Sequence, residues 1–207
     1  MSSTEKRPRK PKARKFYCIG LDFRFRTPPG WQMENLAVLN GGHRTLLAPL
    51  GARGFPQFPE PPRLLIDRAL GRAPVDWELF HDYWIVSDRM KTVLETLDRE
   101  GVAFVRCETR YQGGSAAPVY WLCDVLRLLD AVDEEKSRVK IKHYDSDYKV
   151  YDLMGGASLV FKEEVVGSAH IFRLRFLHPR IICDQSVKDA CKNAGLRGIR
   201  FVDASDC

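Results

Sequence analysis

The chain has 207 residues, of which 44% are hydrophobic and 29% charged, and its formal net charge is +6. This is the composition of a folded protein with one sizeable core or two small ones, and it argues against intrinsic disorder. No apolar run reaches the roughly 18 to 20 residues of a membrane-spanning helix, and the N-terminus lacks the apolar segment of a signal peptide. We therefore expect a cytoplasmic protein that does not enter the membrane.

The positive charge is concentrated in residues 1–15, a basic arm punctuated by proline. Removing its seven basic residues and one acidic residue from the totals of 33 and 27 leaves 26 of each, so the rest of the chain is neutral. Such an arm is expected to be disordered and suited to touching phosphate, anionic lipid or an acidic partner. A nucleic-acid-associated protein that binds weakly through this arm is therefore one alternative function.

Residues 16–78 are predicted to form an N-terminal subdomain, or an extension of the sheet that follows. Residues 22–26 alternate between aromatic and charged side chains, which is the period of a strand with one face on the core. The arginines that flank Phe25 are also suited to binding a phosphate or stacking on a base. Residues 63–70 carry apolar side chains at helix-like spacing before Gly71, so we expect a short helix there.

A loop rich in proline and glycine occupies residues 51–63, and this density excludes regular structure. Phe55 and Phe58 lie within it. Aromatic side chains in such a stiff loop either pin it to the body or project as contact anchors, because a rigid loop loses little entropy on binding. The sequence leaves both alternatives open.

Residues 83–105 are predicted to form a strand, a helix and a second strand. Residues 83–86 are aromatic or β-branched, and Ser87 or Asp88 can cap the following helix. Gly101 is expected to end the helix in the left-handed conformation, and a strand resumes at Val102. Apolar residues recur on one face of the helix at Met90, Val93, Leu94 and Leu97.

Residues 181–202 repeat this pattern more weakly. Residues 181–183 form the strand, Asp184 the cap, and Gly195 the stop before a strand that starts at Gly198. The pattern is common in proteins, so both coincidence and internal duplication are open.

Four alternating segments between residues 137 and 176 predict strands joined by short turns, at 137–144, 148–153, 158–162 and 170–176. They favour an antiparallel meander with the helices gathered on one face, which makes the fold class α+β. Residues 108–118 are expected to be a polar loop. Residues 119–123 are expected to be a strand, and residues 124–131 fit either a short helix or a continuation of that strand.

Reactive groups are sparse. The six cysteines lie mostly in apolar runs and form no Cys-x-x-Cys pair, so we expect free thiols, no metal site and no cofactor. No serine lies in a nucleophile elbow, and no glycine-rich loop has phosphate-binding spacing. The remaining enzyme hypothesis is that His81 and Asp82 converge with Asp88 and Asp124 to shuttle protons. We otherwise predict that the chain is not an enzyme.

Four segments carry a family resemblance: residues 83–90, 120–130, 171–174 and 194–201. In hydrophobic and turn pattern they resemble the Imm11 immunity family of bacterial polymorphic toxin systems. The resemblance covers residues from about 80 to 203, so we expect an Imm11-like domain over residues 79–207. It implies a protein that neutralises a cognate toxin effector by direct contact. It also implies a role in interbacterial competition, with effectors that commonly travel by type VI secretion.

A binding protein needs a contact surface, and tight inhibitors bury about 1,600 Å² with aromatic and arginine side chains as anchors. Exposed loops are the expected place for such anchors. The predicted partner-binding residues are Arg53, Phe55, Phe58, Arg110 and Tyr111.

Overall fold

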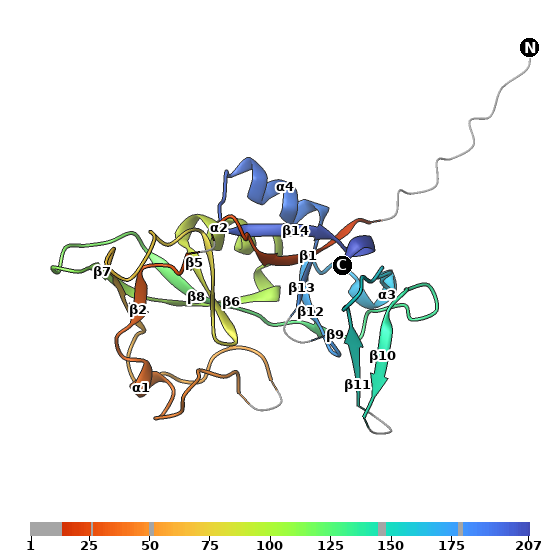
Figure 1. Cartoon of the computed structure of the whole chain (residues 1–207), viewed down its shortest axis with the longest axis horizontal. Helices are drawn as coiled ribbons and strands as arrows, with labels where there is room; N and C mark the ends of the chain where they lie inside the picture. Colours follow the sequence, from red (N-terminus) through yellow and green to blue (C-terminus); the bar gives the residue numbers. More distant parts are fainter. Residues whose placement is uncertain (1–13, 26, 50–51, 145–147, 178–179) are drawn as a thin grey trace, which may run out of the picture.

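The computed structural model describes residues 14–25, 27–49, 52–144, 148–177 and 180–207 (Figure 1). Most of the basic arm, residues 1–13, lies outside these ranges. The fold is α+β, as predicted, with mostly antiparallel sheets and short helices. No helix in the described ranges has the length and apolar character needed to cross a bilayer.

The largest sheet has five strands in the order β14-β1-β13-β12-β9. All of its neighbouring strands are antiparallel except β12 and β9. The strands are β1 (Phe16–Leu21), β9 (Leu128–Leu129), β12 (Ile171–Leu174), β13 (Ile181–Asp184) and β14 (Ile199–Asp203).

A second sheet has four antiparallel strands in the order β4-β5-β8-β6. They are β4 (Trp77–Phe80), β5 (Tyr83–Ser87), β6 (Val102–Arg106) and β8 (Tyr120–Val125).

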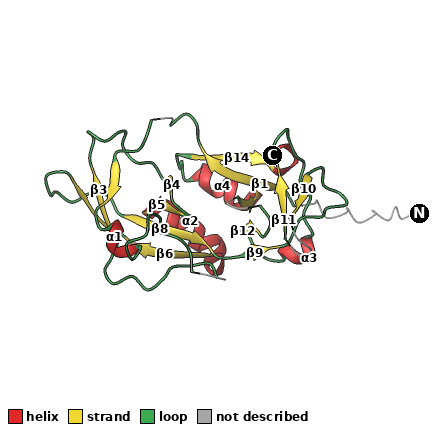
Figure 2. Cartoon of the chain, turned by 60° about the horizontal axis from the view of Figure 1, so that its bottom comes forward, coloured by secondary structure: helices red, strands yellow, loops and turns green. Residues whose placement is uncertain are grey.

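Two smaller sheets lie at opposite ends of the molecule, as Figure 2 shows. One has the order β2-β3-β7, and the other is the hairpin β10-β11. Their strands are β2 (Trp31–Met33), β3 (Arg63–Ile66), β7 (Glu108–Tyr111), β10 (Lys140–His143) and β11 (Lys149–Asp152). The helices are α1 (Leu36–Leu39), α2 (Asp88–Asp98), α3 (Glu163–Val166) and α4 (Gln185–Asn193), with 3-10 turns η1 (Arg99–Gly101) and η2 (Ala204–Asp206).

Both predicted strand-helix-strand units are present. Ser87 caps α2 by accepting a hydrogen bond from the Met90 amide (3.2 Å), and Asp184 caps α4 by accepting from the amides of Ser186 and Val187. Gly195 has the expected positive φ of 62°. Gly101 does not, which corrects the prediction: an added Cβ there would contact the Asp98 carboxylate at 2.8 Å, so glycine is needed for space.

The two units share one arrangement. β5 and β6 are parallel and flank β8, as β13 and β14 are parallel and flank β1; β4 borders β5 as β12 borders β13. The central strand β8 follows the unit β5-α2-β6 along the chain, whereas the central strand β1 precedes the unit β13-α4-β14. Strand order and direction are therefore the same in both sheets, while the chain order differs.

Three apolar cores result, because both sheets are buried on both faces. The central core lies under α2 and α4, whose Met90 and Cys191 sulfur atoms are 3.9 Å apart. The second core lies between the other face of the five-stranded sheet and hairpin β10-β11. The third lies between the other face of the four-stranded sheet and the β2-β3-β7 sheet. Alternate residues of one strand enter different cores, as Tyr83 and Trp84 do.

Several local predictions are wrong. The meander predicted over residues 137–176 is absent, because β10 and β11 form a sheet of their own and β12 pairs with β13 and β9 in the five-stranded sheet. Residues 63–66 form β3 and not the predicted helix. Leu64, Leu65 and Ile66 are all buried, so the strand lacks the alternating pattern that would have distinguished it from a helix. Residues 108–111 form β7 and not a loop, and residues 158–162 make isolated bridges and not a strand. β8 runs from Tyr120 to Val125, so residues 124 and 125 follow the strand alternative that the sequence left open.

One cysteine pair also differs from expectation. Cys18 and Cys207 form a disulfide, with Cα atoms 6.8 Å apart. Cys18 lies opposite Val202 on β14. The turn η2, which follows β14, brings Cys207 back beside Cys18. Sequence context could not show this, because the two residues meet only after the sheet has formed. The other four cysteines are free and buried, and burial raises the pKa of Cys107 and Cys191 to about 12.

Candidate functional site

Arg53 holds the proline-rich loop against the body. Its Nη1 donates to Asp82 Oδ2 (3.0 Å), and its Nη2 donates to the Asp82 carbonyl (3.2 Å) and to Asp124. The Gly54 amide donates to the other Asp124 oxygen at 2.7 Å. The Arg53 side chain is only 10% exposed. This predicted anchor is therefore directed inward.

Arg173 completes a buried ionic cluster of Arg53, Asp82, Asp124 and Arg173. It extends from β12, and its Nη2 donates to Asp124 (3.0 Å) and to the Asp82 carbonyl (3.2 Å). Asp124 on β8 has no exposed surface, and Arg173 is 2% exposed. Burial opposes the charge of Arg53, but Asp124 and Asp82 raise its pKa; burial and Arg53 lower the pKa of Arg173. The cluster joins the loop, the β4-β5 turn and both large sheets.

Phe55 and Phe58 pack inward as well. The Phe55 ring centroid lies 4.9 Å from that of Tyr83 and 6.1 Å from that of Phe58. Both phenylalanines contact the third core. The Tyr83 hydroxyl shares its one hydrogen between the carbonyls of Leu47 (3.0 Å) and Gly54 (2.9 Å), and burial raises the Tyr83 pKa. Of the two alternatives for these aromatic side chains, the structure shows the pinned one.

Arg110 and Tyr111 lie on β7, at the edge of the β2-β3-β7 sheet. The Arg110 side chain is 45% exposed, and its Nε donates to Glu34 Oε2 at 3.2 Å. Tyr111 is partly buried and lines a cavity of about 440 Å³ with Gln112 and residues 66–68. Of the five predicted anchors, Arg110 is therefore the most exposed.

The proposed proton-shuttling group comes together only in part. Asp82 and Asp124 converge, but both bind arginines. His81 has a positive φ of 53°, its Nδ1 accepts a hydrogen bond from the Leu46 amide (2.7 Å), and burial lowers its pKa. Asp88, at the other end of β5, accepts from Trp121 Nε1 at 2.9 Å.

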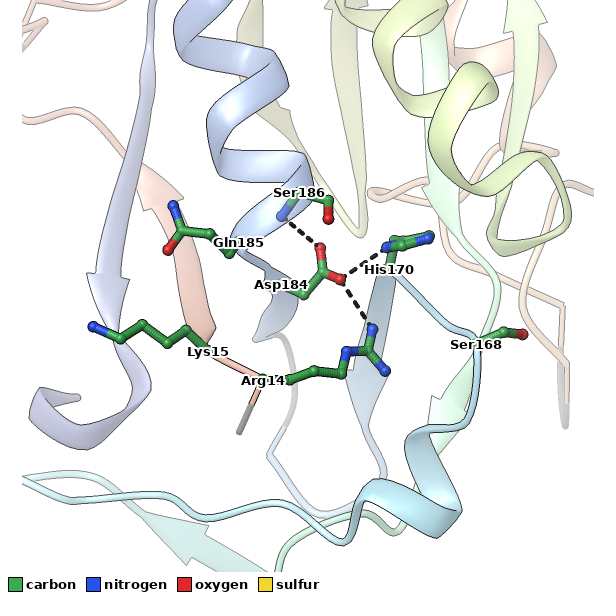
Figure 3. A pocket seen from close by; sticks show the side chains of 7 residues that line it. All are labelled: Arg14, Lys15, Ser168, His170, Asp184, Gln185 and Ser186. Atoms are coloured by element: carbon green, nitrogen blue, oxygen red, sulfur yellow. Dashed lines mark hydrogen bonds and ion pairs between the residues drawn. The ribbon is translucent and has the colours of Figure 1, made fainter. Parts of the chain in front are cut away.

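A cavity of about 600 Å³ lies where the chain enters β1, beside the start of α4 (Figure 3). Asp184 Oδ2 accepts from Arg14 Nη2 (2.9 Å) and pairs with His170 Nδ1 (2.8 Å), while its Oδ1 accepts from the Ser186 amide. Arg14 Nη1 also donates to the Gly167 carbonyl at 2.6 Å. Figure 3 shows Ser168 directed away from the His170–Asp184 pair. The carboxylate thus caps the helix and anchors the base of the arm.

Sequence reasoning missed Arg14, His170 and Arg173. Asp184 was predicted as a cap, and a capping carboxylate with a second free oxygen is a signal that basic partners can be expected near it. Nothing in the local sequence indicates which ones. Among the described residues no group of histidine, cysteine or acidic side chains is arranged to hold a metal ion.

The chain belongs to the Imm11 family of immunity proteins, whose profile it matches over residues 15–206. The match extends the resemblance seen from about residue 80 back to the start of β1, and the family points to a toxin-neutralising role. Comparison with curated proteins gives no match.

Proposed function

We propose that this protein binds one cognate secreted toxin by direct contact and neutralises it, without catalysing a reaction. The observation that carries the proposal is the family match over residues 15–206. The toxin belongs to a polymorphic toxin system of the kind used in interbacterial competition, delivered by type VI or related secretion. The immunity protein protects the cell that makes it and its siblings.

The binding surface in this proposal includes Arg110 and Tyr111. Arg110 offers an exposed guanidinium held by Glu34, and Tyr111 lines a cavity. Arginine and tyrosine side chains supply a large share of the binding energy in protein interfaces. Arg53, Phe55 and Phe58 keep the loop in shape and influence binding through that shape.

Co-purification tests the function. The tagged chain is co-expressed with the product of the adjacent gene and purified in 0.5 M salt, where the screening length is about 4 Å. We expect the two proteins to co-elute, and we expect the neighbour to be toxic when expressed alone and harmless with the chain. Loss of the complex in salt, with retention of nucleic acid at low salt, would instead support binding through the basic arm.

The proposal places the protein in the cytoplasm of the producing cell. The Cys18–Cys207 disulfide is more typical of an oxidising compartment. Cell fractionation under thiol-blocking conditions checks this point. A cytoplasmic protein is expected to be recovered with Cys18 and Cys207 reduced, and recovery of the disulfide form from the periplasm contradicts the cytoplasmic assignment.

A further inference from the structure

The turn that follows β1 lies against the start of β14. The Asp22 amide donates to the Gly198 carbonyl at 3.0 Å, and Leu21 is paired with Ile199. A third segment joins them through the bridge between Pro29 and residue 72. These contacts bring together a set of aromatic and basic side chains that we call the arginine–phenylalanine patch: Phe23, Arg24, Phe25, Arg72, Arg197 and Arg200.

Each phenylalanine ring of this patch has at least one guanidinium group stacked over it. The Phe25 ring has Arg72 Cζ at 5.3 Å from its centroid and Arg197 Cζ at 5.2 Å. The Phe23 ring has Arg200 Cζ at 5.5 Å and remains 63% exposed. A guanidinium stacked on a ring is weakly hydrated and held in place, so it loses little freedom on binding a partner.

The charges of the patch are only partly compensated. Arg24 pairs with Asp22 (2.6 Å), and Arg72 pairs with Glu78. Arg197 and Arg200 are exposed, and neither forms an ion pair with a carboxylate in the described part of the chain. Two guanidinium forks with aromatic support are therefore available to outside carboxylates, which match their geometry bidentately.

We propose that the arginine–phenylalanine patch is an anchor through which this protein binds an acidic surface of its toxin. This inference rests on the proposed function and names the chemistry of the partner. Charge complementarity argues for the occupant, because exposed arginines beside an exposed aromatic ring combine the two side-chain types that are enriched at interface centres. A nucleic acid is the less favoured occupant, since residues 16–207 carry balanced charge and offer few cations to follow a phosphate backbone.

The test compares two double variants matched in chemistry. F23A/R200E changes the patch, and Y144A/K140E makes the same kinds of change on hairpin β10-β11, where Tyr144 is also 63% exposed. All of these side chains are exposed, so both variants should melt close to the parent in circular dichroism. The probe is the purified product of the adjacent gene, and affinity is measured by calorimetry at 0.15 M salt.

We expect F23A/R200E to weaken binding at least about 30-fold, and Y144A/K140E less than about threefold. R200K, which keeps the charge, should retain more affinity than R200E. If the parent binds and F23A/R200E binds equally well, the patch proposal is overturned and the toxin-binding function stands. If the parent protein itself does not bind the product of the adjacent gene, the patch proposal and the toxin-binding function are both overturned. If F23A/R200E loses the parent's binding to a single-stranded RNA 30-mer but keeps its affinity for the toxin, the patch proposal is overturned in favour of a nucleic acid as the partner.

Discussion

Asp124 has no exposed surface, and its carboxylate accepts hydrogen bonds from two arginines that come from distant parts of the chain. At the scale of single residues, burial with a full set of partners decides what a polar side chain does here. The same holds for Asp184, whose carboxylate pairs with Arg14 and His170 and also accepts a hydrogen bond from the Ser186 amide of the helix. The carboxylates of Asp124 and Asp184 therefore have structural roles.

Replacing Arg53 with alanine tests this directly. The change removes a positive charge that pairs with the carboxylates of Asp124 and Asp82 in a buried site. We therefore expect the free energy of unfolding, measured in urea, to fall by about 3 to 5 kcal/mol. Arg24→Ala is the matched control, because Arg24 is 86% exposed, and its urea midpoint should stay at the parent value. An Arg53→Ala protein that is as stable as the parent but binds the toxin poorly would restore Arg53 as a contact residue.

His81 predicts a pH dependence. Its folded-state pKa is lowered by burial, so its contribution to stability is fully present above the unfolded pKa of about 6.5 and is lost as the pH falls below it. Protonation also removes the acceptor for the Leu46 amide. Chemical denaturation between pH 7.5 and 5 should show a loss that His81→Asn abolishes, since asparagine tolerates positive φ and offers an acceptor that does not titrate. Identical pH profiles for the two proteins would contradict this.

At the scale of elements, the sequence was most informative where the signals are local. Helices α2 and α4 were predicted with their caps, because apolar spacing and capping depend on residues within a few positions. β3 was mistaken for a helix because a strand buried on both faces loses its alternation. The inward direction of the Arg53 side chain has no local signal, because its partners are 29 and 71 positions away.

Replacing the two helix-capping residues, Ser87 and Asp184, should lower the free energy of unfolding by different amounts. Ser87→Ala removes the hydrogen bond that Ser87 Oγ accepts from the Met90 amide and the one that it donates to Asp76 Oδ1 (2.6 Å), and it should cost about 1.5 kcal/mol. Asp184→Ala removes a cap and the partner of Arg14 and His170, so we expect about 3 kcal/mol. Asp184→Asn, which keeps a capping oxygen and loses the charge, should fall between them. Urea midpoints measure all three, and equal losses for Ser87→Ala and Asp184→Ala would show that the ion pairs of Asp184 contribute nothing.

At the scale of the whole molecule, long-range pairing determines the architecture. β1 lies between β13 and β14, and the predicted boundary between residues 78 and 79 falls within β4. Residues 16–78 thus contribute strands to three sheets, which favours the extension over the separate subdomain. No local pattern near Phe16 indicates that its strand pairs with residues near the other end of the chain.

This arrangement gives a final prediction. A chain that starts at residue 79 should not melt cooperatively, because β13 and β14 lose the strand between them and the central core loses Tyr17 and Ile19. A chain that starts at residue 14 should melt like the parent. A chain that starts at residue 27 should fail for the same reason as the first.

Appending residues 14–25 after residue 207 through a short linker should restore the chain that starts at residue 27. Tyr17 is paired with Asp203, so the end of β14 lies beside the start of β1, and the central strand would then follow its unit as β8 follows β5-α2-β6. Circular dichroism melts compare the four chains. Cooperative melting of residues 79–207 alone would establish a separate domain there, and failure of the rearranged chain would show that β1 must be joined to β2 to fold.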